Sequence, residues 1–440
     1  MRPIRQVLLP ALALTALLAV AHAVRAVGPD DRAATVSDPV YAFEKSLAAL
    51  PTKEAQIDAT RKFFDGLKDR DTKLAAVGVF DARYVYTVPA EAADDVLGKL
   101  LNDSDLKVRL RAAHALGYLG KGGNHFDDLV ALFKDADVAG LHDVLYAMGR
   151  SRDQQFVPFL REALKSDDSG VKLAAAFELA RLSARDARGD IVPLLKDPKP
   201  EVRACAIENL SLLGDDADTP RIREMLDDPD AFVRSRAATA LGFRKGDETA
   251  KALAAKLTDP APSVRAAAAF SLGELKATAY RGAVEKLLDD HDLVARRYAV
   301  KSLGEMGDAA ARPALEGKLK DEDYMVRSLA LESLSALGDK AAAKAVAAAL
   351  ADPQADVRRS AAEALMRLKA VESVPALLKL LDDKDDRVRW MAALAVGRLG
   401  DPSVLPELRR QLDKPDADVR DKLSEAISEI ETREKERRNP

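Results

Sequence analysis

One feature constrains this sequence more than any other: a motif that returns every 31 residues over more than 300 residues. Its clearest copies read V-R-x-x-A-A-x-x-L-G, at Val108–Gly117 and again at Val264–Gly273. We take the first residue of each copy as its anchor, and the anchors are Val108, Gly140, Val171, Val202, Val233, Val264, Ala295, Val326, Val357, Val388 and Val419. The first spacing is 32 residues and every later one is 31. A constant period of this length indicates a repeat array in which each unit stacks on its neighbours.

Each period predicts two helices. The helix that begins at the anchor has apolar residues at +4, +7, +8 and +11, which form one stripe at a period of 3.6. It is expected to end at Gly-Asp, as at Gly214, Gly307, Gly338 and Gly400, where Gly suits a left-handed C-cap. The preceding helix carries Pro in its first turn, where the missing N–H costs nothing. The sequence therefore predicts an all-α superhelix of about eleven 31-residue helical hairpins plus an N-terminal helical cap.

The composition agrees with this fold class and narrows the function. Hydrophobic residues make up 48% of the chain, enough for a large core. Aromatic residues make up only 5% while Ala and Leu are abundant, which favours helices over strands. The 68 basic and 72 acidic residues give a net charge of −4, so no electrostatic feature favours nucleic-acid binding. Cys205 is the single cysteine, so no disulfide can form within the chain.

The N-terminus predicts export. Arg2 and Arg5 precede an apolar run from Val7 to Ala21, and small-x-small cleavage patterns end at Ala23 and Ala26. This is the layout of a signal peptide, and we expect a periplasmic or secreted protein; the alternative is an uncleaved N-terminal membrane anchor. The predicted organisation is a signal peptide over 1–26, a linker over 27–38, a helical cap and degenerate repeat over 39–91, the array over 92–430 and a charged tail over 431–440 that should fray.

Two charged positions recur with the repeat. Position +1 is Lys or Arg in ten copies: Arg109, Lys172, Arg203, Arg234, Arg265, Arg296, Arg327, Arg358, Arg389 and Arg420. Position −5 is Asp in nine copies: Asp103, Asp135, Asp197, Asp228, Asp259, Asp290, Asp321, Asp352 and Asp383. Chemistry needs one special site rather than the same pair in every copy. We therefore expect a structural ladder, in which Asp binds backbone N–H groups and the Arg of its own or a neighbouring repeat.

Positions +2, +6 and +10 point away from the apolar stripe, and in the first six copies they carry an unusual set of side chains. These are His114, Tyr118, His142, Tyr146, Arg150, Phe177, Arg181, Phe243 and Phe270, with Trp390 at +2 much later. Aromatic and Arg side chains on a solvent-facing surface are typical of protein-binding sites. Two interpretations stay open: these residues bind a partner, or they fill the gap between successive helices.

The run D-x-D-x-x-V-R-x-x-A-A-x-A-L-G-x-L-G at Asp103–Gly120 resembles the HEAT repeat, in the short variety of phycobilisome-lyase-type proteins. The resemblance covers about three quarters of the chain and implies a helical superhelix with the anchor helices on its inner, concave side. Deoxyhypusine hydroxylase, an enzyme of this group, binds iron through His-Glu pairs, and this sequence has no His-Glu dipeptide. Bilin lyases act on a cytosolic pigment system, which fits poorly with an export signal, and the charge balance does not favour the HEAT-like DNA glycosylases.

No phosphate-binding, zinc-binding or nucleophile motif occurs in the sequence. We therefore expect a non-catalytic interaction scaffold without cofactor or metal, monomeric, that binds a protein or peptide on its concave face. It is expected to meet a membrane only if the N-terminal segment is retained. The alternatives are a HEAT-derived lyase or other enzyme, and a membrane-tethered assembly factor.

Overall fold

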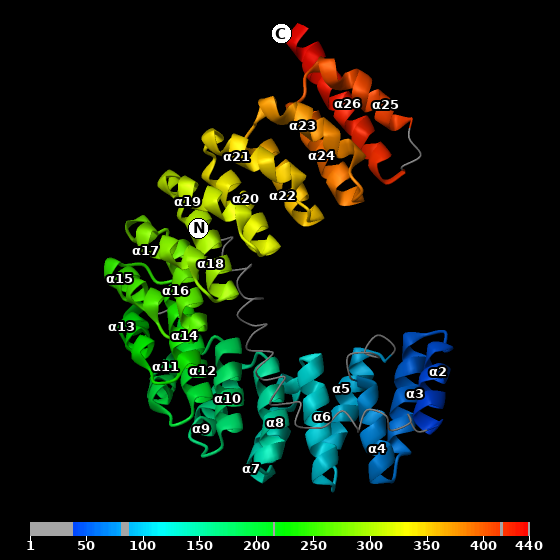
Figure 1. Ribbon diagram of the computed structural model, residues 1–440. Helices are drawn as coiled ribbons and strands as arrows, with labels where there is room; N and C mark the ends of the chain where they lie inside the picture. Colours follow the sequence, from blue (N-terminus) through cyan, green and yellow to red (C-terminus); the bar gives the residue numbers. More distant parts are fainter. Residues whose placement is uncertain (1–37, 81–87, 214–215, 414–416, 439–440) are drawn as a thin grey trace. The chain divides into compact units, whose positions relative to one another are not determined.

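The computed structural model describes residues 38–80, 88–213, 216–413 and 417–438, and these residues form helices and turns without a strand. The predicted signal peptide over 1–26 and nearly all of the linker therefore lie outside the described residues. Contacts divide the chain into two compact units, one up to residue 215 and one from residue 216. Within each unit, the helices that begin near the anchors pack side by side, and the helices between them form a second row (Figure 1).

The helices of the first row, which we call the anchor helices, repeat with the predicted phase. In the first unit they are α6 (Leu106–Leu119), α8 (Val138–Arg150), α10 (Ser169–Arg181) and α12 (Pro200–Leu213). In the second unit they are α14 (Ala231–Leu241), α16 (Pro262–Glu274), α18 (Leu293–Met306), α20 (Tyr324–Leu337), α22 (Ala355–Arg367), α24 (Asp386–Leu399) and α26 (Ala417–Arg438). All-helical architecture with this repeat confirms the predicted fold class.

The second row consists of shorter helices, which we call the companion helices. They are α5 (Ala90–Leu100), α7 (Phe126–Asp135), α9 (Val157–Ala163), α11 (Arg188–Ile191), α13 (Thr219–Glu224), α15 (Asp247–Ala255), α17 (Arg281–Glu285), α19 (Arg312–Gly317), α21 (Ala343–Ala348), α23 (Val374–Lys379) and α25 (Leu405–Leu412). From α11 to α23, each companion helix passes into a 3₁₀ turn before the Asp at −5. That Asp has an extended backbone, as in Asp259 with φ −60° and ψ 141°, and this ends the helix.

Local sequence sets where the anchor helices begin and end. An Asp three residues before the anchor caps seven of them by accepting backbone N–H groups, at Asp105, Asp137, Asp168, Asp230, Asp292, Asp323 and Asp385. Position +12 is left-handed at Gly120, Gly307 and Gly338, but also at Arg152, Ser183, Lys276 and Lys369. The prediction for Gly400 was wrong, because its φ is −69°, and Gly214 lies outside the described residues. The left-handed turn thus follows the phase of the repeat more closely than it follows glycine.

The N-terminal region forms a cap, as three helices: α2 (Asp38–Ala48), α3 (Lys53–Asp65) and α4 (Arg70–Val77). Helix α3 packs on the companion helix α5 and α4 packs on the anchor helix α6, so these two helices make one irregular repeat. Stacked rings of Phe43 and Phe63, with centroids 4.1 Å apart, join α2 to α3. Aromatic packing therefore joins the first two helices that the structure describes.

The C-terminal end differs from the prediction. Residues 431–438 were expected to fray, but they continue α26, which is 22 residues long, against 11 to 14 for the other anchor helices. Arg433 explains the difference, because its guanidinium donates to the carbonyl oxygens of Arg398, Gly397 and Gly400 at 2.6, 2.6 and 2.8 Å. These bonds satisfy backbone carbonyl oxygens at the C-terminal end of α24, and they hold residues 431–438 against the preceding repeat.

Close approach of neighbouring anchor helices packs the core of each unit. Position +9 is Gly, Ala or Ser in every repeat except that of Met366, and a Cβ on Gly273 would lie 2.9 Å from Cα of Ser302, the +7 residue of the next repeat. The hydroxyl groups of Ser271, Ser302 and Ser333 donate to backbone carbonyl oxygens one repeat earlier, at 2.8, 2.7 and 3.0 Å. Small residues at +7 and +9 therefore let the helix backbones nearly touch, while +4, +8 and +11 fill the interior.

The charged positions −5 and +1 lie together as a ladder between repeats. Arg265 binds both carboxylate oxygens of Asp290 in the next repeat, at 2.6 and 2.7 Å, and donates to the carbonyl oxygen of Asp259 in its own repeat. The same bidentate pairing joins Arg234 to Asp259, Arg327 to Asp352 and Arg358 to Asp383. Lys172 pairs with Asp197, and Arg109 pairs with Asp135.

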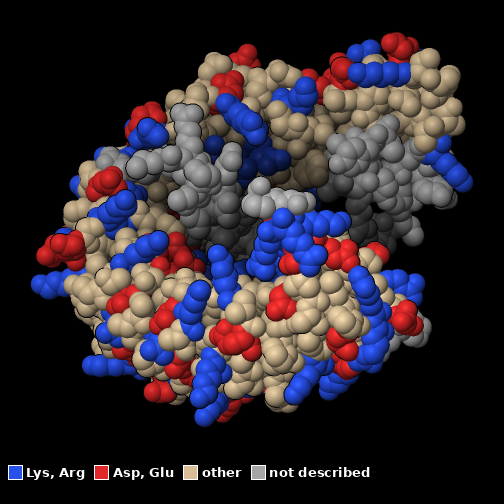
Figure 2. Space-filling model, turned by 90° about the horizontal axis from the view of Figure 1, so that it is seen from above, with Lys and Arg blue, Asp and Glu red and all other residues tan. Residues whose placement is uncertain are grey.

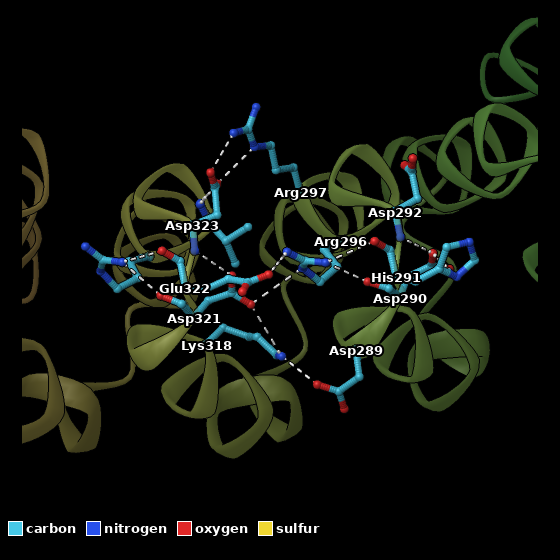
Figure 3. Close-up of polar contacts among 12 residues, drawn as sticks. Asp289, Asp290, His291, Asp292, Arg296, Arg297, Lys318, Asp321, Glu322 and Asp323 are labelled. Atoms are coloured by element: carbon cyan, nitrogen blue, oxygen red, sulfur yellow. Dashed lines mark hydrogen bonds and ion pairs between the residues drawn. The ribbon is translucent and has the colours of Figure 1, made fainter.

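The Asp residues of this ladder also hold their own turns. In every one but Asp135, the carboxylate accepts the backbone N–H two residues later, as in Asp290 with Asp292 at 2.9 Å. Figure 3 shows the variant at Arg296, whose guanidinium lies 3.7 Å from Asp321 and donates to Glu322 at 3.0 Å. Arg203 and Arg389 donate to the carbonyl oxygens of Asp197 and Asp383. Lys73 of α4 pairs with Asp103 at 2.6 Å, so the ladder extends into the irregular first repeat, which the sequence pattern did not reveal.

The Arg265 guanidinium holds the pKa of Asp290 below its ordinary value, chiefly by hydrogen bonding. Stability gained from this pairing is therefore present at neutral pH and is lost as the pH falls through the folded-state pKa. Both side chains are less than 10% exposed, so the pair lies where water screens it little. Removing one partner would leave the other charge desolvated and without a counter-charge. A shifted stack would separate the partners in the same way, so the ladder favours the register in which each Arg lies opposite its Asp.

We expect Leu272→Ala, at the fully buried +8 position of α16, to lower the free energy of unfolding by about 2–5 kcal/mol, because it leaves a cavity in a close-packed layer. Chemical denaturation followed by circular dichroism measures the change. Leu212→Ala is the matched control, since Leu212 is 50% exposed, and should change stability by about 0.5 kcal/mol or less. Equal effects of the two substitutions would contradict the assigned phase.

Candidate protein-binding face

One side of each anchor helix lies next to its buried stripe, and most of its side chains are at least partly exposed. With 3.6 residues per turn, positions −1, +3, +6 and +10 fall within an arc of about 60° on this side. We call the surface formed by these four positions the ring face. The predicted positions +6 and +10 belong to it, whereas +2 lies farther round the helix.

In the first unit, the ring face carries a stacked cluster across α6 and α8. His114 Nδ1 lies 2.8 Å from a carboxylate oxygen of Asp143, and its ring stacks on Tyr146 at 4.9 Å between centroids. The Arg150 guanidinium lies 5.8 Å from the centre of the Tyr146 ring. Tyr146 is half-buried, and burial raises the pKa of its hydroxyl. The structure thus brings three of the predicted residues into direct contact.

The next anchor helix, α10, repeats the arrangement of a ring with a cation. Arg181 lies 4.9 Å from the centre of the Phe177 ring, and both residues belong to the predicted set. Such cation–π contacts order a side chain while leaving one side of the ring accessible. Phe177 and Tyr118 are half-buried, and so is His142, which packs against Gly170. The half-burial of these rings shows that they pack between helices and also present an edge to solvent.

Glu178 is a residue of this region that the sequence interpretation missed. It occupies position +7, where the other described repeats have Ala, Ser or Asn, and it lies 3% exposed between α8 and α10. A Cβ on Gly149 would come within 2.0 Å of its carboxylate, so only glycine fits opposite it. Burial raises the pKa of Glu178 to about 7, against the opposing effects of Arg181, which donates to it at 2.8 Å, and of Arg150. Comparison of position +7 across the repeats could have identified it, because Glu178 is the one charged residue at that position.

In the second unit, the ring face is more exposed. Phe232 and Met325, both at position −1, are 45% and 41% exposed, and Tyr298 at +3 is 39% exposed. Tyr298 meets Phe270 edge to face at 5.9 Å between centroids, and the Lys301 ammonium lies 5.7 Å from the Phe270 ring. Arg236 lies over the ring of Phe232 at 4.9 Å. These apolar groups follow α14, α16, α18 and α20 in successive repeats.

The prediction therefore captured part of this face. Phe243 and Phe270 are half-buried members of it, whereas Phe232, Val294, Tyr298 and Met325 were missed because positions −1 and +3 were not considered. Trp390, at +2, is 37% exposed with the Lys422 ammonium 5.3 Å from its ring. A search at −1, +3, +6 and +10 together would have found the additional residues.

The electrostatic character of the surface is mixed. On the side seen in Figure 2, basic and acidic side chains lie intermixed rather than in one broad area of a single sign. Across the described ranges, no three His, Cys, Asp or Glu side chains lie together as they would around a metal ion. Among the same residues, no helix has the length and apolar character needed to cross a bilayer.

Comparison with known proteins places the repeat in a family. A model of the HEAT repeats matches residues 93–174, 157–242, 220–294, 250–335, 281–366 and 343–428. These matches overlap and run through most of the chain. No curated protein matches this sequence.

Solved structures show the same fold at low identity. A chain of the complex of Kap95p with RanGDP is 14% identical with a TM-score of 0.56, over 89% of this chain and 62% of that chain. YibA of E. coli is 22% identical with a TM-score of 0.44, over 63% of this chain and 97% of that chain. The complex of CpcE and CpcF of phycocyanin lyase from Nostoc sp. is 21% identical with a TM-score of 0.35, over 51% of this chain and 94% of that chain. At these identities, the likeness concerns the fold alone.

Glu178 predicts an unusual dependence of stability on pH. Its pKa rises from 4.5 to about 7 on folding, so the folded chain binds more protons than the unfolded chain between these values. Stability from this group is therefore greatest at low pH and is lost as the pH rises through about 7. We expect the native chain to lose about 3 kcal/mol relative to Glu178→Gln between pH 4.5 and pH 8.

Denaturant titrations of both proteins across this pH range measure the difference. Glu332→Gln, at an exposed position of α20, controls for the loss of one carboxylate. A gap between the native chain and Glu178→Gln that stays constant with pH would show that Glu178 does not titrate on folding.

Proposed function

This chain belongs to the HEAT-repeat family, and we propose that it is an exported, non-catalytic scaffold that binds a polypeptide partner on its ring face. HEAT-repeat solenoids commonly mediate protein interactions, and a similar fold occurs in the Kap95p–RanGDP complex.

One observation carries the choice of surface: exposed apolar groups occupy position −1 in three of the four anchor helices from α14 to α20, and Ser263 of α16 is the exception. Phe232, Val294 and Met325 all occupy position −1, and each is more than 40% exposed. Surface hydrophobic residues that are scattered singly need no explanation, but a row of them along a repeat is typical of a binding surface. Such a row suits a partner that is itself extended along the stack.

The rings and the charges beside them define the chemistry of that partner. Arg150, Arg181 and Lys301 each lie within 6 Å of an aromatic ring of the ring face. The same face also carries exposed carboxylates at Glu274, Glu305 and Glu332, so its charges are of both signs. We therefore propose an extended polypeptide whose apolar side chains bury against the rings and whose charges are likewise mixed.

Export rests on the N-terminal sequence. Arg2 and Arg5, the apolar run to Ala21 and the small residues around Ala23 and Ala26 are the features that support it. A retained N-terminal segment would instead make the protein a membrane-tethered assembly factor. The two possibilities differ in the mass of the mature chain.

We expect partner contact to centre on the exposed part of the ring face. Benzoylphenylalanine in place of Tyr298 should give a discrete photo-crosslinked product in cells, and Phe232→Ser with Met325→Ser should abolish it. Because both residues are exposed, their replacement should cost about 1 kcal/mol of stability or less. Half-buried Tyr146 and Phe177 are less suitable, since replacing them also disturbs packing.

Two controls accompany this experiment. Benzoylphenylalanine in place of Lys251, an exposed residue of the companion helix α15, should give no such product, and Val138→Ser should leave the Tyr298 product intact. Products of equal yield from both helix rows, or a Tyr298 product that survives the double substitution, would argue against the ring face.

For export, we expect the intact mass of the purified mature protein to correspond to a chain that begins after Ala23 or Ala26. The measurement is made on protein from the exported fraction of expressing cells. A full-length mass in the membrane fraction would favour the tethered alternative, and a full-length mass in the cytosol would contradict export altogether.

A further inference from the structure

The ion-pair ladder of the first unit has one gap, between α8 and α10. Position +1 of α8 is Leu141, and position −5 of the next repeat is Ser166, so neither member of the ion pair is present. Within residues 138–181, all of which the structure describes, no other ion pair joins α8 to α10. The other successive repeats of this unit are joined by Lys73 with Asp103, Arg109 with Asp135 and Lys172 with Asp197.

The turn before α10 is nevertheless intact. The hydroxyl group of Ser166 accepts the backbone N–H of Asp168 at 3.1 Å, and Asp168 caps α10. Beyond the ends of the two helices, Gln154 donates to the carbonyl oxygen of Leu182 at 2.8 Å. The residues at this contact therefore keep the hydrogen bonds of the turns while they omit the ion pair between repeats.

The same contact encloses the carboxylate of Glu178. Glu178 occupies position +7 of α10 and lies against Gly149 at +9 of α8. At +7 of α16 and α18, a serine hydroxyl group bonds to the preceding repeat, whereas Glu178 accepts from Arg181 of its own helix. Of the described groups in the helices that pack on α10, Arg150 and Tyr146 of α8 interact electrostatically with Glu178, and no charged group of α9 or α12 does. This contact therefore lacks an ion pair that its neighbours have, and it contains a carboxylate that they do not.

The companion helices beside this contact are joined by aromatic rings. The ring centroids of Phe126 in α7 and Phe156 lie 4.9 Å apart, and Phe159 in α9 meets both Phe126 and Phe133 edge to face. Phe156 is fully buried. Apolar packing of this kind does not depend on ionisation. The row of companion helices is thus held together here, so α8 and α10 can separate only on the side of the anchor helices.

The protonation of Glu178 acts on this separation in a definite direction. Burial raises the pKa of Glu178 to about 7, against the opposing charges of Arg181 and Arg150. Separation of the helices would admit water, and the pKa would return toward 4.5. The closed contact therefore binds the proton more tightly. It is favoured at low pH and is weakened as the pH rises through about 7.

We propose that the contact between α8 and α10 is a joint at which the first unit opens and closes. Tyr146 with Arg150 lies on one side of it and Phe177 with Arg181 on the other, so opening moves apart two ring-and-cation pairs of the ring face. Ionisation of Glu178 favours the open form. A partner that contacts both pairs favours the closed form, and this effect on binding rests on the function proposed above.

Distances between spin labels test the joint in the full chain, with Cys205→Ala to remove the native thiol. One label pair, Ala139→Cys with Glu201→Cys, spans the joint from α8 to α12. The matched pair, Asp71→Cys with Ala139→Cys, spans the two preceding contacts from α4 to α8, and all three positions are exposed. We expect the ratio of open to closed chains from the first pair to rise about tenfold or more between pH 5.5 and pH 8, and the second pair to stay constant.

Two variants assign the cause of this response. Leu141→Arg with Ser166→Asp supplies the missing ion pair of the ladder, so the distance should stay short at both pH values. Glu178→Gln removes the ionisable group, and it should likewise abolish the dependence on pH. Circular dichroism of each variant verifies that the helices remain intact.

A constant distance across the joint between pH 5.5 and pH 8 would overturn the proposal, and so would equal changes in the two label pairs. A response that persists in both variants would show that neither the missing ion pair nor Glu178 causes it, with the same consequence. These measurements contain no partner. The joint can therefore fail while the ring face still gives its photo-crosslinked product, and the ring face can fail while the joint opens.

Discussion

The pairing of Arg or Lys at +1 with Asp at −5 of the next repeat, bidentate at four places in the second unit, is the interaction on which the rest of each unit depends. Because each Arg also donates to a carbonyl oxygen of its own repeat, one side chain connects two turns and sets their spacing. The paired Asp accepts a backbone N–H of its own turn, which places the following helix. Ladder contacts reach only the adjacent repeat, so an irregular repeat such as α3–α4 can join the stack without disturbing distant ones.

Much of the fold could be predicted because every copy of the repeat must bury an apolar stripe at the same positions. The anchor phase located the buried stripe, and Leu272 is fully buried as that phase requires. The length of α26 could not be predicted, since residues 431–438 are charged and their helix depends on Arg433 reaching carbonyl oxygens of α24. The left-handed turn at Lys369 was missed for a related reason: the stack imposes the conformation on a residue that does not favour it by itself.

The candidate site was predictable only in part, because outward positions are not constrained by the core. The sequence pattern located Tyr146 and Phe177 at +6, but exposure is a property of neighbouring side chains, so Phe232 and Met325 emerged only from the structure. Glu178 shows the opposite case. Its position is defined by the repeat, yet its elevated pKa follows from burial opposite Gly149, which requires both helices to be in place.

The left-handed residue at +12 allows the number of repeats in such a chain to change. Seven anchor helices end through this same backbone conformation, at glycine, arginine, serine or lysine. Since the joint is defined by geometry and not by one residue type, a duplicated or deleted unit of 31 residues would bring its own complete joint. Copy number could therefore drift through genetic recombination while each surviving hairpin kept its shape, and the individual side chains on its outer surface would remain free to diverge.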